Sequence, residues 1–421
     1  MNSVANIVQS SEINSPLKNI SKRNLISAQS ILRGPHNDSI AIIGKYLSYN
    51  GYFNALEIQK IQALNGTKYI QECGGFALPS SSPSPLSILS NGSLKHSTYR
   101  YDSLPSTLNV EKCNSQKNSS DLQVHQPNPS WGLSRLCSEK LPVYMYNGGR
   151  GFVSPNSGEN IVVYVIDTGV NINHVDFGGR ASFGANFVKN VTTGELLEDD
   201  YDHNGHGTMV ASLVAGCRLG VAKKSRIISY KVAGKSGNGD IGAAVKALGQ
   251  ITKDIENAKD GRSASIVVCS FLFLGQYISW NDALVEFTNL GHAYFAPAGN
   301  QSDDSCGSSP IMSHAAIVVG ASDPSDGYMG STSFGRCVDI FAPGVDITGA
   351  SNTNITGTAI KTGTSFSAPL VAGIGALILS NYPNLSPAQL KAKLIEYSVK
   401  NILPSTLVNT TNILAQIPSS F

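Results

Sequence analysis

Short segments that are apolar without interruption recur along the second half of this 421-residue sequence. They are separated by stretches with the composition of helices. A strand that is apolar on both faces, rather than at every second residue, is typical of a parallel sheet covered by helices on both sides. The pattern therefore predicts a doubly wound α/β fold with a mostly parallel sheet. The expected strands lie at residues 161–166, 227–232, 266–274, 293–298, 316–319 and 338–341, and the expected helices at 207–216, 241–256 and 281–290.

Functional groups in a sheet of this kind gather beyond the carboxyl ends of its strands. Asp167 stands directly after the first expected strand and is followed by Thr168 and Gly169. A carboxylate that only caps a turn is the alternative interpretation. Asp-Thr-Gly is also the signature of aspartic proteases, but their chemistry needs two such carboxylates that share a proton. The sequence holds no second Asp-Thr-Gly and no Asp-Ser-Gly.

A histidine between two glycines is the second candidate. His206 opens an apolar helical stretch, and Gly205 and Gly207 let the backbone approach closely and leave the imidazole accessible. His203, three residues earlier, makes a metal pair conceivable. Catalytic zinc normally takes three protein ligands, however, and no further ligand cluster follows. A purely structural histidine is the other alternative.

A serine comes just before a buried helix late in the sequence. Ser365 precedes a helix expected from about residue 366 to 381, which is apolar on every side. A serine at such a place is often only a helix N-cap. The functional alternative is a hydroxyl activated by a neighbouring imidazole that a carboxylate orients, with the three groups coming from separate strand ends.

An asparagine supplies the fourth group that acyl transfer requires. Asn300 follows the strand expected at 293–298, and its side-chain N–H can donate a hydrogen bond to a developing oxyanion. Removal of one such donor costs about 100- to 1000-fold in rate. Asn300 also begins an Asn-Gln-Ser glycosylation triplet. A glycan there would block the site, so we expect Asn300 to be unmodified.

These four residues, in the order Asp, His, Asn and Ser, resemble the subtilisin family, and in particular its proteinase K and cerevisin branch. The resemblance covers most of the chain and implies a serine endopeptidase that acts on protein or peptide substrates. By position, Ser365 would be the nucleophile, His206 the general acid and base, and Asp167 the residue that orients the imidazole. Asn300 and the backbone N–H of Ser365 would form the oxyanion hole. Further segments that resemble this branch are Trp131-Gly132-Leu133, Val221-Ala222-Lys223, Phe341-Ala342-Pro343-Gly344 and the tail 390–403.

The resemblance also suggests a domain organisation that includes a small N-terminal α+β propeptide. Asn54 and Glu57 can cap a helix that ends at Gly66, and Thr67–Ile70 can follow as a strand, so residues 51–72 look like one folded unit. We expect this propeptide to act as an intramolecular inhibitor, and self-cleavage to place the mature N-terminus near residues 118–130. The expected divisions are a leader or partial propeptide at 1–50, the remnant of an inhibitor-type propeptide at 51–78, a linker at 79–126 and the peptidase domain at 127–421.

Two structural features rest on the resemblance alone. Cys306 and Cys337 occupy places where cerevisin-like relatives have a matching pair, so we expect a disulfide, with two buried thiols as the alternative. Asp339 matches a calcium-ligand aspartate of proteinase K, with a purely structural aspartate as the alternative. No cofactor is required for the reaction, and a structural calcium is the ion that the resemblance implies.

The sequence departs from the family where substrate is expected to bind. Relatives carry a Ser-Leu-Gly-Gly type of stretch after the central strand, and gapless counting back from Asn300 puts Phe273 and Leu274 in place of its two glycines. We expect these bulky residues to narrow the pocket for the side chain that precedes the cut. The alternative is a slip in register, with the extra apolar atoms facing the core. The substrate-binding candidates are Leu272, Phe273, Leu274, Gly275 and Gly237.

Charge and hydropathy exclude other classes of protein. The 31 Lys and Arg against 29 Asp and Glu give a net charge of +2, so no nucleic-acid partner is expected. The longest nearly uncharged apolar stretch, Ala368–Leu379, is shorter than the roughly 20 residues that span a bilayer, so no membrane span is expected.

Two further questions concern location and activity. The resemblance implies a vacuolar or secreted protein, although residues 1–30 contain no apolar run of the kind a signal peptide needs. The competing functional hypothesis is a catalytically weak or inactive protein that uses the cleft only for binding. Reaction of Ser365 with a serine-directed reagent would separate the two hypotheses.

Overall fold

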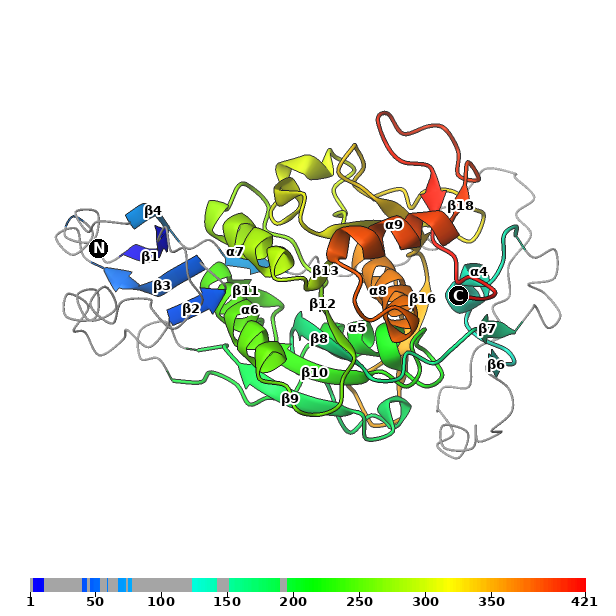
Figure 1. The fold of residues 1–421 in the computed structure, drawn as a ribbon, viewed down its shortest axis with the longest axis horizontal. Helices are drawn as coiled ribbons and strands as arrows, with labels where there is room; N and C mark the ends of the chain where they lie inside the picture. The colour runs from blue at the N-terminus through cyan, green and yellow to red at the C-terminus, as the bar shows by residue number, and fades with distance from the viewer. Residues whose placement is uncertain are drawn as a thin grey trace, which may run out of the picture.

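The computed structural model has a nine-stranded sheet at its centre, with helices on both faces (Figure 1). The strand order is β18-β19-β15-β14-β13-β12-β8-β10-β9, and neighbouring strands are parallel except β18 and β19. The predicted doubly wound α/β fold is therefore confirmed. The strands are β8 (Ile161–Asp167), β9 (Ala181–Asn186), β10 (Arg226–Lys231), β12 (Ala264–Cys269), β13 (Ala293–Pro297), β14 (Ile317–Ser322), β15 (Ile340–Pro343), β18 (Val399–Lys400) and β19 (Ile413–Leu414). The structure describes residues 3–10, 40–43, 46–53, 59, 67–72, 75–77, 123–141, 151–189 and 195–421.

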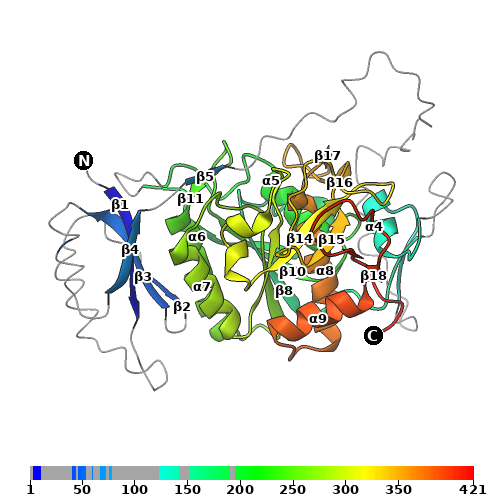
Figure 2. The ribbon, with the colours of Figure 1, turned by 90° about the horizontal axis from the view of Figure 1, so that it is seen from above.

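Helices on the two faces of the sheet bury separate apolar cores, and Figure 2 shows the sheet between these layers. One core lies under α5 (His206–Ala215), α8 (Thr364–Asn381) and α9 (Pro387–Tyr397), with α4 (Trp131–Leu136) at its edge. The other lies under α6 (Ile241–Glu256) and α7 (Ile278–Asn289). Smaller strands are β6 (Val124–Gln126), β7 (Phe152–Ser154), β11 (Asn238–Asp240), β16 (Ile347–Ala350) and β17 (Thr358–Lys361), and the 3₁₀ turns are Val175–Phe177, Ser305–Gly307 and Ile311–Ser313.

The expected boundaries agree best with the observed ones at α6, where a side chain caps the start of the helix. Helix α6 covers the expected residues 241–256, and the side chain of Asp240 accepts a hydrogen bond from the N–H of Ala243 at its start. The strand expected at 266–274 ends at Cys269 instead, because the chain leaves the sheet there. Helix α7 begins at Ile278, three residues before the expected start at 281.

Helix α8 is long and apolar enough to cross a membrane, and it is the one such helix in the described part of the chain. Of its most apolar window, 89% is buried inside the protein. It packs closely on the central sheet: a Cβ added at Gly375 would lie 2.7 Å from the Phe295 ring of β13. Packing in the core therefore explains both its length and its composition.

An antiparallel sheet at the N-terminus extends the folded unit that the sequence suggested. The strands are β1 (Ser3–Ser10), β2 (Ile40–Ile43), β3 (Tyr46–Phe53) and β4 (Thr67–Glu72), in the order β2-β3-β1-β4. The strand predicted at Thr67–Ile70 is confirmed by β4. The unit begins at Ser3 rather than at residue 51, because β1 pairs with both β3 and β4. Apart from Gln59, which is helical, the helix predicted after Asn54 lies outside the described residues, as does most of the predicted linker.

This N-terminal sheet lies against α6 and α7 (Figures 1 and 2). Ile43 of β2 is fully buried within the apolar core under these helices. The side chain of Gln71 in β4 accepts a hydrogen bond from the N–H of Ser279 at 3.1 Å and donates one to the carbonyl of Gln276 at 3.3 Å. Gln71 therefore satisfies the first turn of α7, whose own N-cap residue, Tyr277, makes no side-chain cap.

Candidate active site

Asp167 is the last residue of the central strand β8, and its side chain is fully buried. It lies beside Lys231 of β10 in the parallel register. Its Oδ1 accepts a hydrogen bond from the backbone N–H of Thr168 at 2.8 Å. The strand end and the turn that follows it therefore fix the position of this carboxylate.

His206 is the first residue of helix α5 and reaches the carboxylate of Asp167. Its Nδ1 lies 2.8 Å from Oδ1 and 3.0 Å from Oδ2 of Asp167. Because an ionised carboxylate only accepts hydrogen bonds, Nδ1 is the donor and Nε2 is left as the proton acceptor. Gly205 precedes the helix at a φ of 95°, a conformation that favours glycine. The geometry thus selects the imidazole tautomer that a general base requires.

Ser365 is the second residue of helix α8 and is 4% exposed. The N-cap of that helix is Gly363, so the alternative interpretation of Ser365 as an N-cap is wrong. The residue before it, Thr364, donates from its backbone N–H and from its hydroxyl to Oδ1 of Asn300, both at 2.9 Å. The first turn of α8 is therefore bonded to the end of strand β13.

The residue after Ser365 contacts the imidazole. The ring centroid of Phe366 lies 5.4 Å from that of His206. Ser365 is thus flanked by one residue bonded to Asn300 and by another packed on His206, so the predicted site residues gather around one turn. Among the described residues, no hydrogen bond joins the Ser365 hydroxyl to His206, and that half of the relay stays a prediction.

The amide of Asn300 has a defined orientation. Since its Oδ1 accepts two hydrogen bonds from Thr364, its Nδ2 is left as a donor on the other side. A Cβ added at Gly363 would lie 3.4 Å from this Nδ2, so the donor is close to the turn that begins α8. The first N–H groups of a helix have no intrahelical acceptor. An oxyanion held here could accept hydrogen bonds from the side-chain amide of Asn300 and from the backbone N–H groups of the first turn of α8.

Asp202 is a site residue that the sequence analysis missed. It is fully buried. Its two oxygens accept hydrogen bonds from Oγ1 of Thr168 at 2.8 Å, from the N–H groups of Asn204 at 3.1 Å and Gly205 at 2.8 Å, and from the N–H at 2.9 Å and the hydroxyl at 2.6 Å of Thr208. Asp202 therefore ties the turn after β8 to the turn before α5. The sequence did contain a signal for Asp202, because it is an acidic residue among turn-forming residues just before His206.

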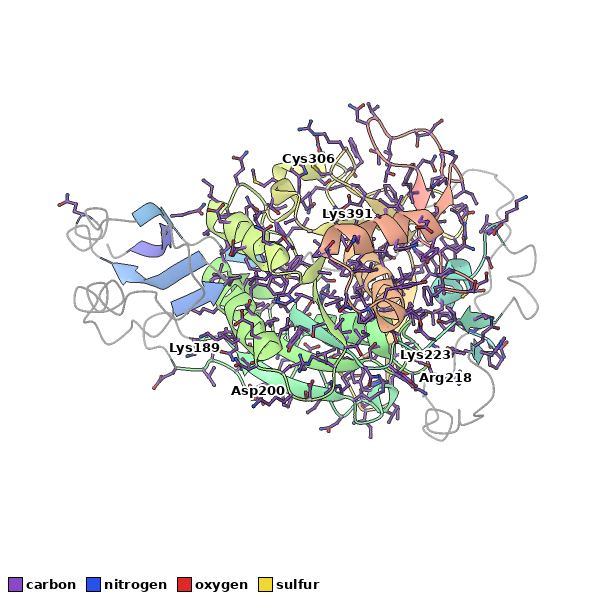
Figure 3. All side chains as sticks on the ribbon, in the orientation of Figure 1. Lys189, Asp200, Arg218, Lys223, Cys306 and Lys391 are labelled. Atoms are coloured by element: carbon purple, nitrogen blue, oxygen red, sulfur yellow. A yellow bond between two sulfur atoms is a disulfide. The ribbon has the colours of Figure 1, made fainter. Side chains whose placement is uncertain are left out.

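The metal alternatives do not fit this geometry. The Nε2 of His203 lies 2.7 Å from Asp199 Oδ1 in a surface pair. The carboxylate of Asp339 lies 2.8 Å from Nζ of Lys391, which is labelled in Figure 3. Because an ammonium already neutralises Asp339, its surroundings favour the structural alternative over a calcium ligand. Within the ranges that the structure describes, no group of three or more His, Cys, Asp or Glu could hold a metal ion.

The two bulky residues at the predicted substrate edge have different surroundings. Phe273 is fully buried, and its ring packs edge-on against the rings of Tyr277 and Trp280. Its N–H donates to the carbonyl of Ser309 at 3.0 Å, and its carbonyl accepts from the N–H of Ser309 at 3.1 Å. The ring of Phe273 therefore faces the core under α7, and the narrowing of the substrate pocket stays a prediction. Leu274 is 63% exposed and does face solvent.

The remaining substrate candidates flank these positions. Leu272 is half-buried, and Gly275 has a φ of 114°, which lets the chain turn away towards α7. Gly237 has a φ of 79° and directly precedes β11. Strand β11 pairs antiparallel with β5 (Gly75–Ala77), a segment from the N-terminal part of the chain. The strand next to Gly237 can thus accept an extended peptide.

The predicted disulfide between Cys306 and Cys337 is present. Cys306, labelled in Figure 3, lies in the loop after Asn300, and Cys337 lies just before β15. The bond therefore ties the segment after Asn300 to the segment before β15. Cys137 and Cys269 are free thiols, and burial raises the pKa of Cys137 to about 11.

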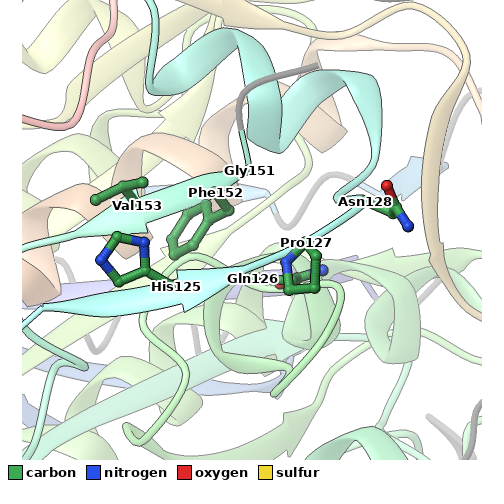
Figure 4. Close-up of a pocket in the computed structure, with 7 residues that line it drawn as sticks. All are labelled: His125, Gln126, Pro127, Asn128, Gly151, Phe152 and Val153. Atoms are coloured by element: carbon green, nitrogen blue, oxygen red, sulfur yellow. The ribbon is translucent and has the colours of Figure 1, made fainter. Parts of the chain in front are cut away.

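A pocket of about 330 Å³ lies away from these groups, at strands β6 and β7 (Figure 4). Its wall includes Phe152, which is fully buried, and Gln126, whose side chain accepts a hydrogen bond from the buried Lys223 at 2.6 Å. None of the predicted site residues lines it. Its residues are His125, Gln126, Pro127, Asn128, Gly151, Phe152 and Val153.

Comparison with known proteins identifies the family of this chain. The sequence pattern of the subtilase family matches residues 158–412. This range contains all four predicted catalytic residues. The chain belongs to the subtilase family. The relatives of this subtilase include proteins named as subtilisin-like serine proteases, which supports a serine endopeptidase.

Several fungal proteins resemble this subtilase over most of its length. A subtilisin-like protease of Coccidioides posadasii is 35% identical over 327 residues, which cover 74% of this chain and 64% of the relative. A subtilisin-like serine protease of Penicillium rubens, Pen ch 13, is 35% identical over 293 residues, which cover 69% of each protein. Cerevisin of Saccharomyces cerevisiae is 35% identical over 306 residues, which cover 69% of this chain and 47% of cerevisin. The subtilase thus spans about half to two-thirds of these relatives.

A solved structure supports the fold. The crystal structure of a cold adapted subtilisin-like serine proteinase matches with a TM-score of 0.61 and 33% sequence identity, covering 69% of this subtilase and 98% of that chain. The resemblance to the subtilisin family and the subtilisin-like α/β fold are therefore confirmed.

Proposed function

We propose that this subtilase is an active serine endopeptidase. Ser365 attacks the carbonyl of the bond to be cut, and His206 takes the hydroxyl proton through Nε2 and later gives it to the leaving amine. Asp167 orients the ring and stabilises the imidazolium that forms. The observation that carries this proposal is the pair of contacts from His206 Nδ1 to Asp167, at 2.8 and 3.0 Å, next to the turn that holds Ser365.

The oxyanion is bound by Asn300 Nδ2 and the backbone N–H of Ser365. The two hydrogen bonds from Thr364 to Asn300 Oδ1 support this assignment, because they turn the amide donor away from Thr364 before substrate arrives. A donor that needs no reorganisation during the reaction is worth about 3 kcal/mol of transition-state binding. The chemistry requires no cofactor. The substrates are proteins or peptides.

The N-terminal unit acts as an intramolecular inhibitor. Its support is the antiparallel pairing of β5 with β11, in the register Asn238–Ala77, Gly239–Phe76 and Asp240–Gly75. An extended substrate would use the same backbone groups of β11, so it competes with β5. The burial of Ile43 and the bonds of Gln71 add a second contact away from the cleft.

Two cuts release this inhibitor. The pairing of β5 with β11 supports a first self-cleavage within the few residues after Ala77. The cut expected near residues 118–130 is a second one, upstream of β6, where the Gln126 side chain is bonded to Lys223 and to the carbonyl of Arg218. A vacuolar or secreted location completes the proposal, since both compartments receive proteins of the branch that the sequence resembles.

A fluorophosphonate reagent tests the proposed activity. Mass spectrometry should find the reagent on Ser365, and Ser365→Ala should be neither labelled nor cut. Labelling that is absent from a folded, processed protein would favour the binding protein over the enzyme. Purified Ser365→Ala that matures to the same products as the unaltered chain would contradict self-cleavage while leaving the labelling result intact.

A further inference from the structure

A buried lysine lies beside the catalytic carboxylate without touching it. Lys231 ends strand β10 next to Asp167, and its side chain is 1% exposed. Its Nζ donates to the carbonyl of Thr168 at 3.0 Å and to the carbonyl of Tyr201 at 2.8 Å. A buried ammonium is costly unless it has hydrogen-bond partners and a counter-charge. Lys231 therefore holds the turn after Asp167 and the segment that leads to His206 at fixed positions.

The counter-charge comes from Glu198. Glu198 Oε2 lies 3.0 Å from Nζ of Lys231. Glu198 stands two residues before Asp200, which Figure 3 labels at the lower edge of the domain. Partial burial by itself would raise the pKa of Glu198, but the hydrogen bond from the Lys235 N–H and the charge of Lys231 lower it. Glu198 is therefore a stable anion in this position.

The second oxygen of Glu198 reaches the turn before the substrate strand. Its Oε1 accepts a hydrogen bond from the backbone N–H of Lys235 at 2.8 Å. That turn is closed by hydrogen bonds from Gly237 N–H to Gly234 O at 2.8 Å and from Gly234 N–H to Asn238 O at 3.0 Å. Asn238 is the first residue of β11, the strand that pairs with β5.

The approach of Glu198 to this turn depends on a missing side chain. A Cβ added at Gly234 would lie 2.9 Å from Glu198 Oε1. Gly234 is not among the glycines with a positive φ, so we expect an alanine to fit the backbone and to press mainly on the Glu198 side chain. Gly234→Ala therefore weakens the bridge without removing either charge.

We propose that Lys231 and Glu198 are positioning residues that join the catalytic turns to the substrate strand β11. The pair fixes the position of the turn after Asp167 relative to the turn before Asn238. A peptide that pairs with β11 then places the bond to be cut next to Ser365. Neither residue touches substrate. This inference rests on the proposed function. It implies that the contribution of the pair to kcat/KM depends on the length of the substrate.

Glu198→Gln tests the bridge with two substrates. A single-residue amide is too short to pair along β11, whereas a tetrapeptide amide is long enough to do so. We expect kcat/KM for the tetrapeptide to fall about tenfold, mainly through KM, and kcat/KM for the single-residue amide to change less than twofold. An equal loss for both substrates would indicate a merely structural role and overturn the proposal, as would full activity towards the tetrapeptide.

Two further variants keep the test independent of folding defects. Gly234→Ala should reproduce the substrate-length effect, and combining it with Glu198→Gln should cost less than the sum of the two because both break one contact. Glu159→Gln is the matched control, since it breaks an exposed pair with Lys224, at 2.5 Å, close to the start of β8. It should leave both substrates unaffected. Additive effects of the first two variants would contradict the bridge.

Amide exchange tests the same bridge without any hydrolysis. In the Ser365→Ala background, Glu198→Gln should speed exchange about tenfold in β11 and at the N–H groups of Val232 and Ala233, which donate to the carbonyl of Asp167 at 2.9 and 3.3 Å. This result is expected whether or not Ser365 reacts with fluorophosphonate, so failure of the bridge is distinguishable from failure of the proposed function. Exchange that stays unchanged at either segment would overturn the proposal.

Discussion

The catalytic turns and the N-terminal unit are held to the same domain by different means. Around His206 the contacts are buried side-chain hydrogen bonds, and Asp202 alone accepts five of them. The N-terminal unit is attached by the backbone pairing of β5 and β11, by Ile43 and by two bonds of Gln71. Water can replace a solvent-accessible bond, whereas a buried polar group that loses its partner costs about 1–3 kcal/mol. We therefore expect the first region to resist local opening more strongly than the attachment of the second.

The largest effect on kcat is expected at Asp167, the buried residue that is bonded to His206. Asp167→Asn should lower kcat about 10⁴-fold, because an amide in this position favours the wrong imidazole tautomer. Steady-state kinetics and the rate of fluorophosphonate labelling should fall together. The control is Asp260→Asn, which makes the same chemical change in a surface ion pair with Arg226 and Arg262. Loss of activity below tenfold for Asp167→Asn would show that the pair with His206 does not act in catalysis.

A smaller loss of kcat should follow when the hydrogen bonds of Asp202 are weakened. Asp202→Asn turns an N–H₂ group towards backbone donors, and we expect kcat to fall about 100-fold, the cost of misplacing a catalytic group by about 1 Å. Denaturant unfolding in the Ser365→Ala background should show a loss of about 2 kcal/mol. A variant that is destabilised but keeps its kcat would separate stability from positioning and break this comparison.

The attachment of the N-terminal unit should respond more weakly and only locally. Gln71→Ala in the full Ser365→Ala chain should raise amide exchange about tenfold in the first turn of α7, because the Ser279 N–H loses its acceptor. Exchange around His206 should not change. An increase that spread through the catalytic turns would mean that the two regions are one cooperative unit.

The last predicted effect lies at the opposite side of the domain and concerns the pH dependence of stability rather than activity. Burial lowers the pKa of Lys223 to about 7, well under the value of about 10.4 in an unfolded chain. Between these values the unfolded state binds more protons, so the free energy of unfolding should rise with pH, by at most about 1.4 kcal/mol per pH unit. Lys223→Met in the Ser365→Ala background should remove this rise. Identical slopes for both proteins between pH 7 and 10 would contradict the assignment.

Sequence reasoning worked where a residue's role depends on its neighbours in the chain. The continuous apolar strands predicted the parallel sheet. Asp167 and Asn300 could be found because Asp167 ends strand β8 and Asn300 lies three residues after the end of β13. The orientation of Asn300, in contrast, depends on Thr364, a residue 64 positions away. The early start of α7 depends on Gln71, 208 positions before Ser279.

The orientation of Phe273 teaches the same lesson about distant contacts. Phe273 occupies a place that relatives give to glycine, and its neighbours in the sequence do not indicate which way the ring points. The direction is set by Trp280 in α7 and by two backbone bonds to Ser309. Likewise, nothing local marks Ile43 as part of the core under α6 and α7. Contacts between separate segments decide these cases, and no local pattern encodes them.

The most direct test of the central claim is a crystal structure of the protein after reaction with a fluorophosphonate. The account predicts a covalent bond from phosphorus to Ser365 Oγ, with the phosphonyl oxygen about 2.7–3.1 Å from both Asn300 Nδ2 and the Ser365 N–H. His206 Nε2 should lie within hydrogen-bond distance of Ser365 Oγ. A phosphonyl oxygen that points to solvent, or an imidazole that stays out of reach of Ser365, would contradict the proposed mechanism.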